Sequence, residues 1–190
     1  DDFAICGNCK HRGIPNNDPN RKIAKNRSCY VNLGQGVLIT YNAYIRGVYP
    51  MANNAASRKE LGRGRVVRVG TYGDPGAVPS FVWDQLLSEC DSHLAYTHQI
   101  GYMPGIAMQS ADSHEQALDL WSKNLRTFRT LDSVNDLDKN NEVLCPASKE
   151  AGRRATCDKC KLCGGLSTKT KKSIAIVLHH AGHKPKKESV

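Results

Sequence analysis

The spacing of the eight cysteines constrains this chain more than any other feature of its sequence. Cys157, Cys160 and Cys163 stand at two-residue intervals, and Cys145 lies upstream with eleven residues between it and Cys157. Disulfides between such near neighbours are strained, because the Cα separation and the sulfur dihedral are hard to satisfy together. Thiolates that converge on one metal centre meet no such conflict. The spacing therefore predicts a metal site on these four cysteines.

The C-x2-C-x2-C pattern favours an iron–sulfur cluster as the metal in this site. It is the spacing of ferredoxin-type loops, in which the backbone wraps around the cluster, and Gly164 and Gly165 let the backbone come close to it. Four-cysteine zinc sites usually combine two separated C-x2-C pairs. The three-plus-one arrangement thus predicts a [4Fe–4S] cluster, with zinc as the alternative.

A second, smaller group of cysteines lies near the start of the chain, as Cys6-x2-Cys9 followed by Cys29. These three thiols have no obvious fourth partner nearby. The candidates are His11, Cys90, or an exchangeable ligand on an open iron. Cys90 ends a predicted helix and has no cysteine neighbour, so its simplest interpretation is a half-buried free thiol. The group predicts a second metal centre of undetermined type.

Helical and strand patterns alternate through the middle of the chain. Helical periodicity covers residues 36–49 and ends at Pro50, and Ser113 with Gln116 forms a predicted capping box. The predicted strands are 65–70, 93–98, 105–110, 127–131 and 173–179, and the other predicted helices are 79–89 and 113–124. Phe81, Val82, Leu86 and Leu87 form the expected core face of the helix at 79–89.

This alternation indicates βα units on a parallel sheet. Five strands are too few for a closed eight-stranded barrel, so the predicted fold is α/β, with a partial or degraded (βα) barrel-like sheet and cysteine-rich loops. A length of 190 residues suits one domain. Its expected parts are an N-terminal cysteine region at 1–35, a βα core at 36–142, a cluster loop at 143–168, a final strand at 169–181 and a basic tail at 182–190.

Polar residues follow several of the predicted strands, at the edge where parallel sheets bind ligands. They are Tyr72, Asp74, Tyr96, Thr97, His98, Gln109, Ser110, Asp112, His179 and His180. Two cysteine groups packed over this edge would share one site. The alternative is that these residues only begin loops and cap helices. Asp74 and His98 are candidate acid–base groups, but the pattern assigns no catalytic residue, and at most one of His179 and His180 can face the site.

Charge and hydropathy restrict the partners of the chain. Lysine and arginine exceed the acidic residues by 27 to 18. They cluster at 21–27, 58–68 and 169–187, which predicts either contact with nucleic acid or solvated loops. An aromatic content of 6% argues against a base-stacking platform. No apolar run approaches the roughly 20 residues of a membrane helix, and the first residues lack a signal peptide's features. A cytoplasmic protein is expected.

Several short motifs resemble, in order, a phage-encoded protein family named only for its gene-product number. They are 70–74, 95–97, 109–112, the Cys29-Tyr30 pair and the cysteine series from Cys145 to Cys163. Proteins of this family are described as radical-SAM-like or barrel-like. The resemblance implies a phage or prophage setting, hence the host cytoplasm, and a barrel-related fold with iron–sulfur ligation. Cys29 would be the last cysteine of the family's N-terminal trio, although the C-x2-C start departs from the usual radical-SAM spacing.

Two functional hypotheses follow from these patterns. In the first, the chain is an iron–sulfur protein for redox, electron-transfer or radical chemistry. Its cluster is held by Cys145, Cys157, Cys160 and Cys163, and a second centre by Cys6, Cys9 and Cys29. In the second, zinc or a cluster stabilises a non-enzymatic module that binds nucleic acid through its basic loops.

Overall fold

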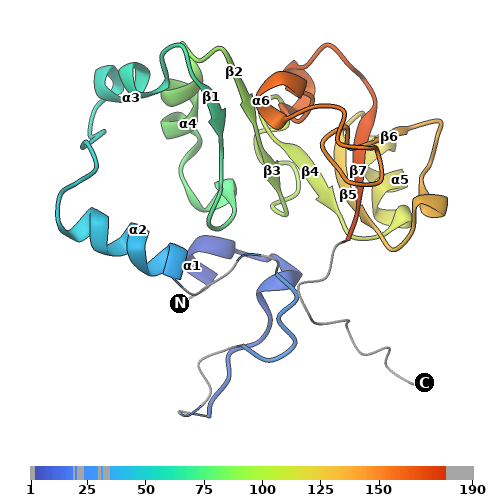
Figure 1. The fold of residues 1–190 in the computed structure, drawn as a ribbon, viewed down its shortest axis with the longest axis horizontal. Coiled ribbons are helices and arrows are strands. Elements are labelled where there is room, and N and C mark those ends of the chain that lie inside the picture. Colours follow the sequence, from blue (N-terminus) through green and yellow to red (C-terminus); the bar gives the residue numbers. More distant parts are fainter. Residues whose placement is uncertain (1–2, 19, 21–23, 30, 32–34, 179–190) are drawn as a thin grey trace.

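The computed structural model describes residues 3–18, 20, 24–29, 31 and 35–178 (Figure 1). The strands are β1 Val66–Arg68, β2 Ser92–Leu94, β3 Tyr96–Thr97, β4 Met108–Ala111, β5 Thr127–Leu131, β6 Glu142–Leu144 and β7 Ser173–Val177. The α-helices are α1 Phe3–Cys6, α2 Gln35–Ile45, α3 Ala55–Gly62, α4 Ser80–Leu87, α5 His114–Ser122 and α6 Cys157–Cys160. Four short 3-10 turns are η1 Lys10–Arg12, η2 Pro75–Ala77, η3 Val134–Asp136 and η4 Gly165–Ser167.

Every strand pair in the described part of the chain is parallel. One sheet has the order β3-β4-β5-β7-β6, and β1 pairs with β2 in a second sheet. Ala95 joins the two sheets, because it separates β2 from β3 and its carbonyl accepts a hydrogen bond from the Met108 N–H at 3.0 Å. The α/β class with parallel sheets is therefore confirmed. The pairings of the described strands form open sheets, with β6 at one end.

The predicted strands are all present, with two differences. The segment predicted as one strand at 93–98 is split by Ala95 into β2 and β3, which pair in different sheets. The sequence patterns also missed β6, a three-residue strand that follows a turn and contains a buried glutamate, Glu142. Neither feature has an apolar periodicity of the kind that marks a strand in sequence.

Small residues dominate the buried core. One cluster contains Val69, Ala95 and Ala107, and a second contains Ala111, Ala117 and Leu120 beneath α5. The predicted core face of α4 is wrong in one position, because Phe81 is 51% exposed and lies under the guanidinium of Arg58. A cation over an aromatic face is a normal arrangement for an exposed ring.

The predicted helix at 36–49 corresponds to α2, and its apolar side chains are exposed. Ala43 is its buried residue, whereas large side chains such as Ile39 and Tyr41 remain about 60% exposed. α2 therefore adds little to the core that the structure describes. Among the described residues, no helix combines the length and the apolar character that crossing a bilayer requires.

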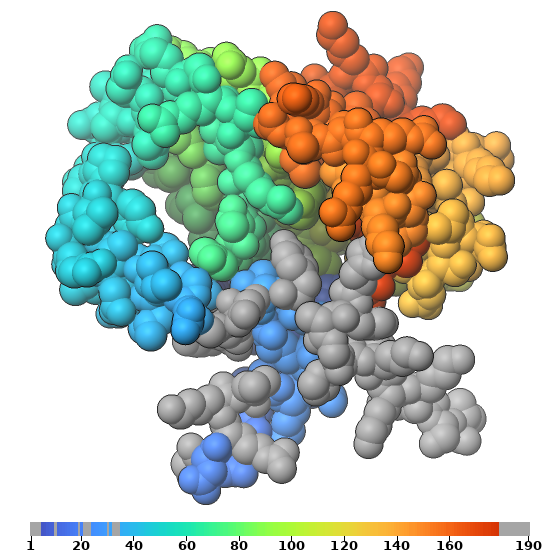
Figure 2. All heavy atoms as spheres, in the orientation of Figure 1, coloured from blue at the N-terminus to red at the C-terminus, as the bar shows by residue number. Residues whose placement is uncertain are grey.

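Two segments flank the five-stranded sheet. The cysteine-rich connection from β6 to β7 covers its front face (orange in Figure 2), and the N-terminal segment lies below the strands (blue). Leu166 N–H donates to the Pro104 carbonyl at 2.9 Å, which attaches the connection to the loop before β4. The two groups of cysteines therefore lie on different sides of the sheet.

Candidate metal sites

The N-terminal segment docks on the carboxyl ends of the parallel strands. The Asp74 N–H donates to the Ile5 carbonyl at 2.7 Å, and the Gln99 side chain donates to the Cys6 carbonyl at 3.5 Å. Gly73 permits this approach, because it has a φ of +100° and a Cβ at this position would lie 2.3 Å from the Ile5 oxygen. The N-terminal segment thus meets residues of the middle of the chain at the edge where parallel sheets bind ligands.

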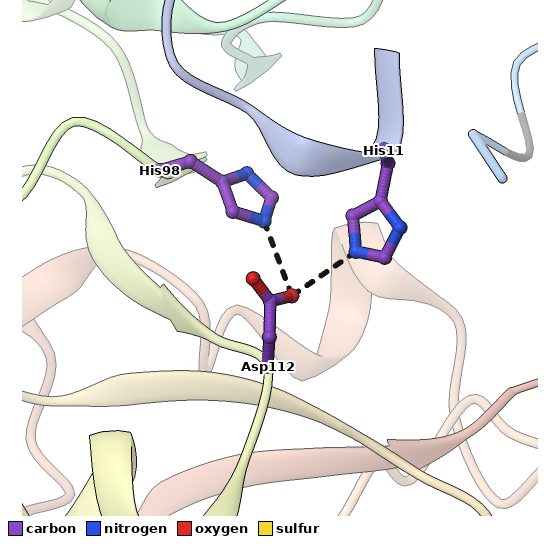
Figure 3. Close-up of side chains that lie close together, drawn as sticks. All are labelled: His11, His98 and Asp112. Atoms are coloured by element: carbon purple, nitrogen blue, oxygen red, sulfur yellow. Dashed lines mark hydrogen bonds and ion pairs between the residues drawn. The ribbon is translucent and has the colours of Figure 1, made fainter. Parts of the chain in front are cut away.

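Two histidines and one carboxylate converge at this edge (Figure 3). His11 Nε2 lies 3.0 Å from Asp112 Oδ1, and His98 Nε2 lies 3.5 Å from the same oxygen. The three side chains are 11–22% exposed. Among the described residues, they form the one group of three or more His, Cys, Asp or Glu ligand atoms that lie within 4.8 Å of one another. We call this group the His–Asp site.

Neighbouring polar groups fix the orientation of the site. Ser28 Oγ lies 2.8 Å from His11 Nδ1. The Gln116 side chain, predicted to cap α5, instead accepts from the Asp112 N–H at 2.8 Å, while Ser113 caps the helix. The first contact orients the His11 ring, and the second fixes the backbone of Asp112.

Asp74 supports the histidine at position 98. Its carboxylate accepts from the Thr97 hydroxyl at 2.5 Å and from the His98 N–H at 2.7 Å, and it lies 4.0 Å from His98 Nδ1. The predicted acid–base pair Asp74 and His98 is therefore brought together, with Asp74 placed behind the imidazole. Asp112, rather than Asp74, faces the Nε2 atom.

The electrostatics of the site favour the protonated form of His98. Burial disfavours the imidazolium, but the side chains of Asp112 and Cys9 outweigh this effect and raise the pKa of His98 to about 9. This interaction also shows that Cys9 lies beside the His98 ring. His93 shows the opposite behaviour, because burial is the main effect there and lowers its pKa.

The remaining N-terminal cysteines lie around this site. The Cys29 N–H donates to the His11 carbonyl at 3.0 Å, and the Cys9 N–H donates to the Cys6 carbonyl at 3.2 Å. Cys90 does not join them, because it directly precedes β2, at the opposite end of the strands from His98. It is a half-buried free thiol, and burial is the main reason that its pKa is raised.

Backbone hydrogen bonds fold the loop that carries the C-terminal cysteines back on itself. Cys145 follows β6 and its N–H donates to the Ala175 carbonyl at 2.7 Å. The loop that follows turns back, because the Arg153 N–H donates to the Ser148 carbonyl at 2.9 Å and the Ala155 N–H to the Pro146 carbonyl at 3.3 Å. This closure returns the chain to Cys145 just before Cys157.

A single helical turn and a reversal of the chain carry the other three cysteines, which are Cys157, Cys160 and Cys163. Cys157 and Cys160 begin and end α6, so that they share a helix face. Lys161 then adopts a left-handed conformation with φ of 56°, and the Cys163 carbonyl accepts from the Ala95 N–H at 2.9 Å. The reversal directs Cys163 back toward the sheet.

The thiols of this loop affect one another electrostatically. Burial is the main cause that raises the pKa of Cys163 to about 12, and charges on Cys145, Cys160 and Cys157 raise it further. The pKa of Cys145 is raised by burial and by Cys157 and Cys160. Charges separated by more than about 10 Å are largely screened. The four thiols thus influence one another's ionisation, although no three cysteine sulfurs in the described part of the chain lie within 4.8 Å of one another, and none of the eight cysteines forms a disulfide.

A buried arginine that sequence patterns missed lies under this loop. Arg126 is 5% exposed and donates to the carbonyls of Leu162, Gly165 and Lys172, at 2.9, 2.5 and 2.7 Å. Burial lowers its pKa, and the charge of Cys163 acts in the opposite direction. Within the described residues, no carboxylate forms an ion pair with Arg126, although a buried cation normally has one.

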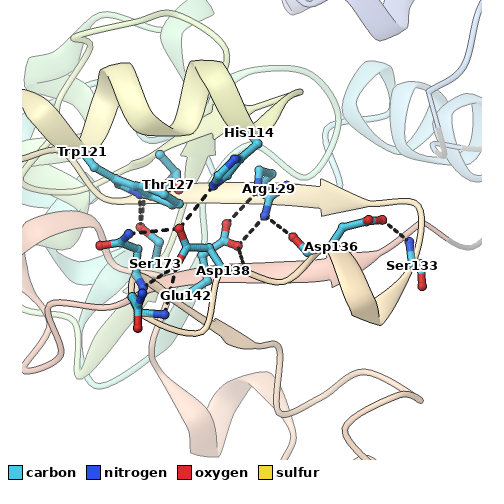
Figure 4. Close-up of polar contacts among 11 residues, drawn as sticks. His114, Trp121, Thr127, Arg129, Ser133, Asp136, Asp138, Glu142 and Ser173 are labelled. Atoms are coloured by element: carbon cyan, nitrogen blue, oxygen red, sulfur yellow. Dashed lines mark hydrogen bonds and ion pairs between the residues drawn. The ribbon is translucent and has the colours of Figure 1, made fainter.

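A second buried arginine, Arg129, has such a partner (Figure 4). Its Nε and Nη2 donate to the two oxygens of Glu142 at 2.8 and 2.6 Å. Arg129 Nη2 also donates to the Asp136 carbonyl, and the Asp138 N–H donates to Glu142. This network is structural, because it joins β5 to β6 and to the loop between them.

Other residues predicted at the strand edge have structural roles. Gln109 is fully buried and accepts from the Gly101 N–H at 2.7 Å, while Tyr96 stacks on Phe128. Tyr72 is 45% exposed. The prediction that both cysteine groups might share this edge is not met, since the C-terminal loop covers a face of the sheet. His179 and His180 lie outside the described residues.

The second predicted basic cluster is largely engaged within the protein. Arg58 donates to the Gln85 side chain at 2.7 Å, and Arg63 pairs with Glu60 and Glu89. The first and third clusters lie partly outside the described residues. The contacts of Arg58 and Arg63 fit the interpretation of these charges as ordinary surface groups.

Comparisons with known proteins identified no match for this chain. No family model matches it, and searches of curated proteins and of solved structures gave no match.

Proposed function

We propose that this chain is an iron–sulfur protein that carries a [4Fe–4S] cluster on Cys145, Cys157, Cys160 and Cys163. The proposal rests on the spacing of these four cysteines and on the loop fold, in which backbone hydrogen bonds turn the chain back before Cys157 and none of the four forms a disulfide. The negative charges of the four thiolates would repel one another, and the positively charged iron–sulfide core of a cluster would offset this repulsion. The cluster would serve redox or electron-transfer chemistry.

The three-plus-one spacing of the cysteines in the sequence favours a cluster over zinc. Four thiolates on one zinc ion, with bonds of about 2.3 Å, lie about 3.8 Å apart in a tetrahedron. In the described part of the chain, no three cysteine sulfurs lie within 4.8 Å of one another. A cubane cluster binds each cysteine to a different iron and spreads the sulfurs further.

Arg126 supports an anionic centre in this loop. A [4Fe–4S] cluster with four thiolate ligands carries net negative charge, whereas the described hydrogen-bond acceptors of Arg126 are carbonyl and hydroxyl oxygens. The cluster would be the missing counter-charge for this buried guanidinium. Charges and hydrogen bonds near a cluster also set its reduction potential, so Arg126 would raise the potential.

We also retain the other expectations drawn from the sequence, which concern a second metal centre, the barrel-like fold and the cellular setting. A second metal centre would lie in the N-terminal segment, which carries Cys6, Cys9 and Cys29 together with His11. A partial barrel and a phage setting accord with the family resemblance. Eight free cysteines suit a reducing compartment such as the cytoplasm.

Metal analysis of anaerobically purified protein tests this proposal. We expect a brown protein with broad absorbance near about 400 nm and with stoichiometric iron and acid-labile sulfide. Cys145→Ser should remove most of the iron and sulfide of this cluster. Cys90→Ser is the matched control and should leave both unchanged. Colourless protein with one zinc per chain would exclude the cluster.

A further inference from the structure

We propose that His11, His98 and Asp112 form a mononuclear site for a divalent first-row transition metal such as zinc or ferrous iron. This inference changes the ligand set of the second centre, which sequence assigned to Cys6, Cys9 and Cys29. It does not depend on the C-terminal cluster. Two imidazoles and one carboxylate are a common ligand set for such ions, and they leave positions open for water or substrate.

The distances between the ligand atoms fit one metal ion. Bonds of about 2.1 Å from metal to nitrogen and oxygen place neighbouring ligand atoms about 2.9 Å apart at right angles and about 3.4 Å apart in a tetrahedron. The observed separations from Asp112 Oδ1 are 3.0 Å to His11 Nε2 and 3.5 Å to His98 Nε2. The geometry requires little rearrangement to accept an ion.

The orientation of the rings fits as well. Metal-binding histidines usually present one nitrogen to the ion and hydrogen-bond the other to a protein group. Here both Nε2 atoms point at Asp112 (Figure 3), while His11 Nδ1 lies 2.8 Å from Ser28 Oγ and His98 Nδ1 lies 4.0 Å from Asp74. His11 thus has a hydrogen-bonding group on the side away from the carboxylate, whereas Asp74 lies behind the His98 ring beyond hydrogen-bond distance of its Nδ1.

The positions of the three residues favour a site over an incidental ion pair. They come from three separate segments, namely η1, the loop after β3 and the end of β4, and they meet where parallel strands bind ligands. A structural ion pair needs one histidine per carboxylate, as in His114 and Asp138 at 3.2 Å. At the His–Asp site, two imidazoles converge on a single oxygen. Cys9 also acts on the His98 ring, but its sulfur does not lie within 4.8 Å of all three ligand atoms, so the site as it stands has three ligands.

Cobalt(II) binding to the full chain tests the site, because cobalt reports its ligands through visible absorption. Protein treated with a mild chelator that leaves iron–sulfur clusters intact should bind one Co²⁺ in competition with Zn²⁺. His98→Ala and Asp112→Asn should each weaken Co²⁺ binding at least 100-fold. Ser28→Ala should weaken it about 10-fold, because it loosens His11. His114→Ala is the matched control and should have no effect.

The outcomes separate the alternatives. A sulfur-to-cobalt charge-transfer band that disappears in Cys9→Ser would add Cys9 as a ligand. Unchanged Co²⁺ affinity in His98→Ala, with circular dichroism and iron content like those of the native protein, would overturn the proposal. So would a loss of iron in Cys6→Ser and Cys29→Ser but not in His98→Ala, which would restore a cysteine-held centre. Failure of the C-terminal cluster would appear as low iron in every variant, without change in Co²⁺ binding.

Discussion

Two buried arginines lie three positions apart at β5, and their surroundings differ. Arg129 forms a two-point pair with Glu142, so the region between β5 and β6 balances its own charge. Arg126 reaches the cysteine loop and is surrounded there by carbonyl oxygens. A buried charge without a partner is costly. The proposed cluster would supply the anionic group beside Arg126, whereas the network of Figure 4 has its counter-charge within the protein.

The largest expected effect comes from removing the cluster. Chelation under oxidising conditions should expose the amides of residues 145–172 to hydrogen exchange, with protection reduced at least a hundredfold, since the loop holds few buried apolar side chains. Amides of β4 and β5 should stay protected. Mass spectrometry of exchanged peptides measures both regions in one sample. Equal loss of protection in β5 would contradict the distinction between the two regions.

Breaking the ion-pair network around Arg129 and Glu142 should lower the free energy of unfolding of the whole protein. Glu142→Gln leaves Arg129 buried without a counter-charge, which typically costs about 3–5 kcal/mol. Urea unfolding measures this loss of stability. Iron content should not change, and if it fell together with stability, the network and the cysteine loop would not be independent.

Replacing Arg126 should affect both stability and redox behaviour. Arg126→Met leaves the Leu162, Gly165 and Lys172 carbonyls without a donor, at a cost of about 2–3 kcal/mol. It also removes a positive charge beside the cluster, so the midpoint potential should fall by on the order of 50 mV, close to a tenfold change for one electron. Arg126→Lys keeps the charge and should restore most of the potential. A potential that is the same in Arg126→Met and the native protein would falsify the counter-charge assignment.

The smallest expected effect concerns pH. The Asn141 side chain is the main cause that lowers the pKa of Asp138 from 3.8 to about 2, with help from His114. Because the folded pKa is depressed, Asp138 stabilises the protein above pH 3.8, and this contribution is lost as the pH falls toward 2. Asp138→Asn should therefore cost about 1 kcal/mol at pH 7. The difference from the native protein should shrink at pH 3, as measured by urea unfolding at both pH values.

The sequence alone predicts those features that depend on residues close together along the chain. The helix and strand patterns gave the α/β class, and the C-x2-C-x2-C spacing marked the C-terminal loop. The His–Asp site was not visible as a group, although His11, His98 and Asp112 each stood out, because their meeting depends on strand order and on where the N-terminal segment docks. Arg126 gave no signal, since its burial follows from the loop that folds over it.

The strand order has a consequence for how the chain folds. β7 is the last strand in sequence, yet it lies between β5 and β6, with Ile174 opposite both Phe128 and Val143. Parallel neighbours require a crossover, and a helix usually supplies it. Here the cysteine loop is the crossover, so its ordering has to accompany the insertion of β7. Until the whole loop has been synthesised, the sheet would therefore have a gap between β5 and β6, whether or not metal is bound.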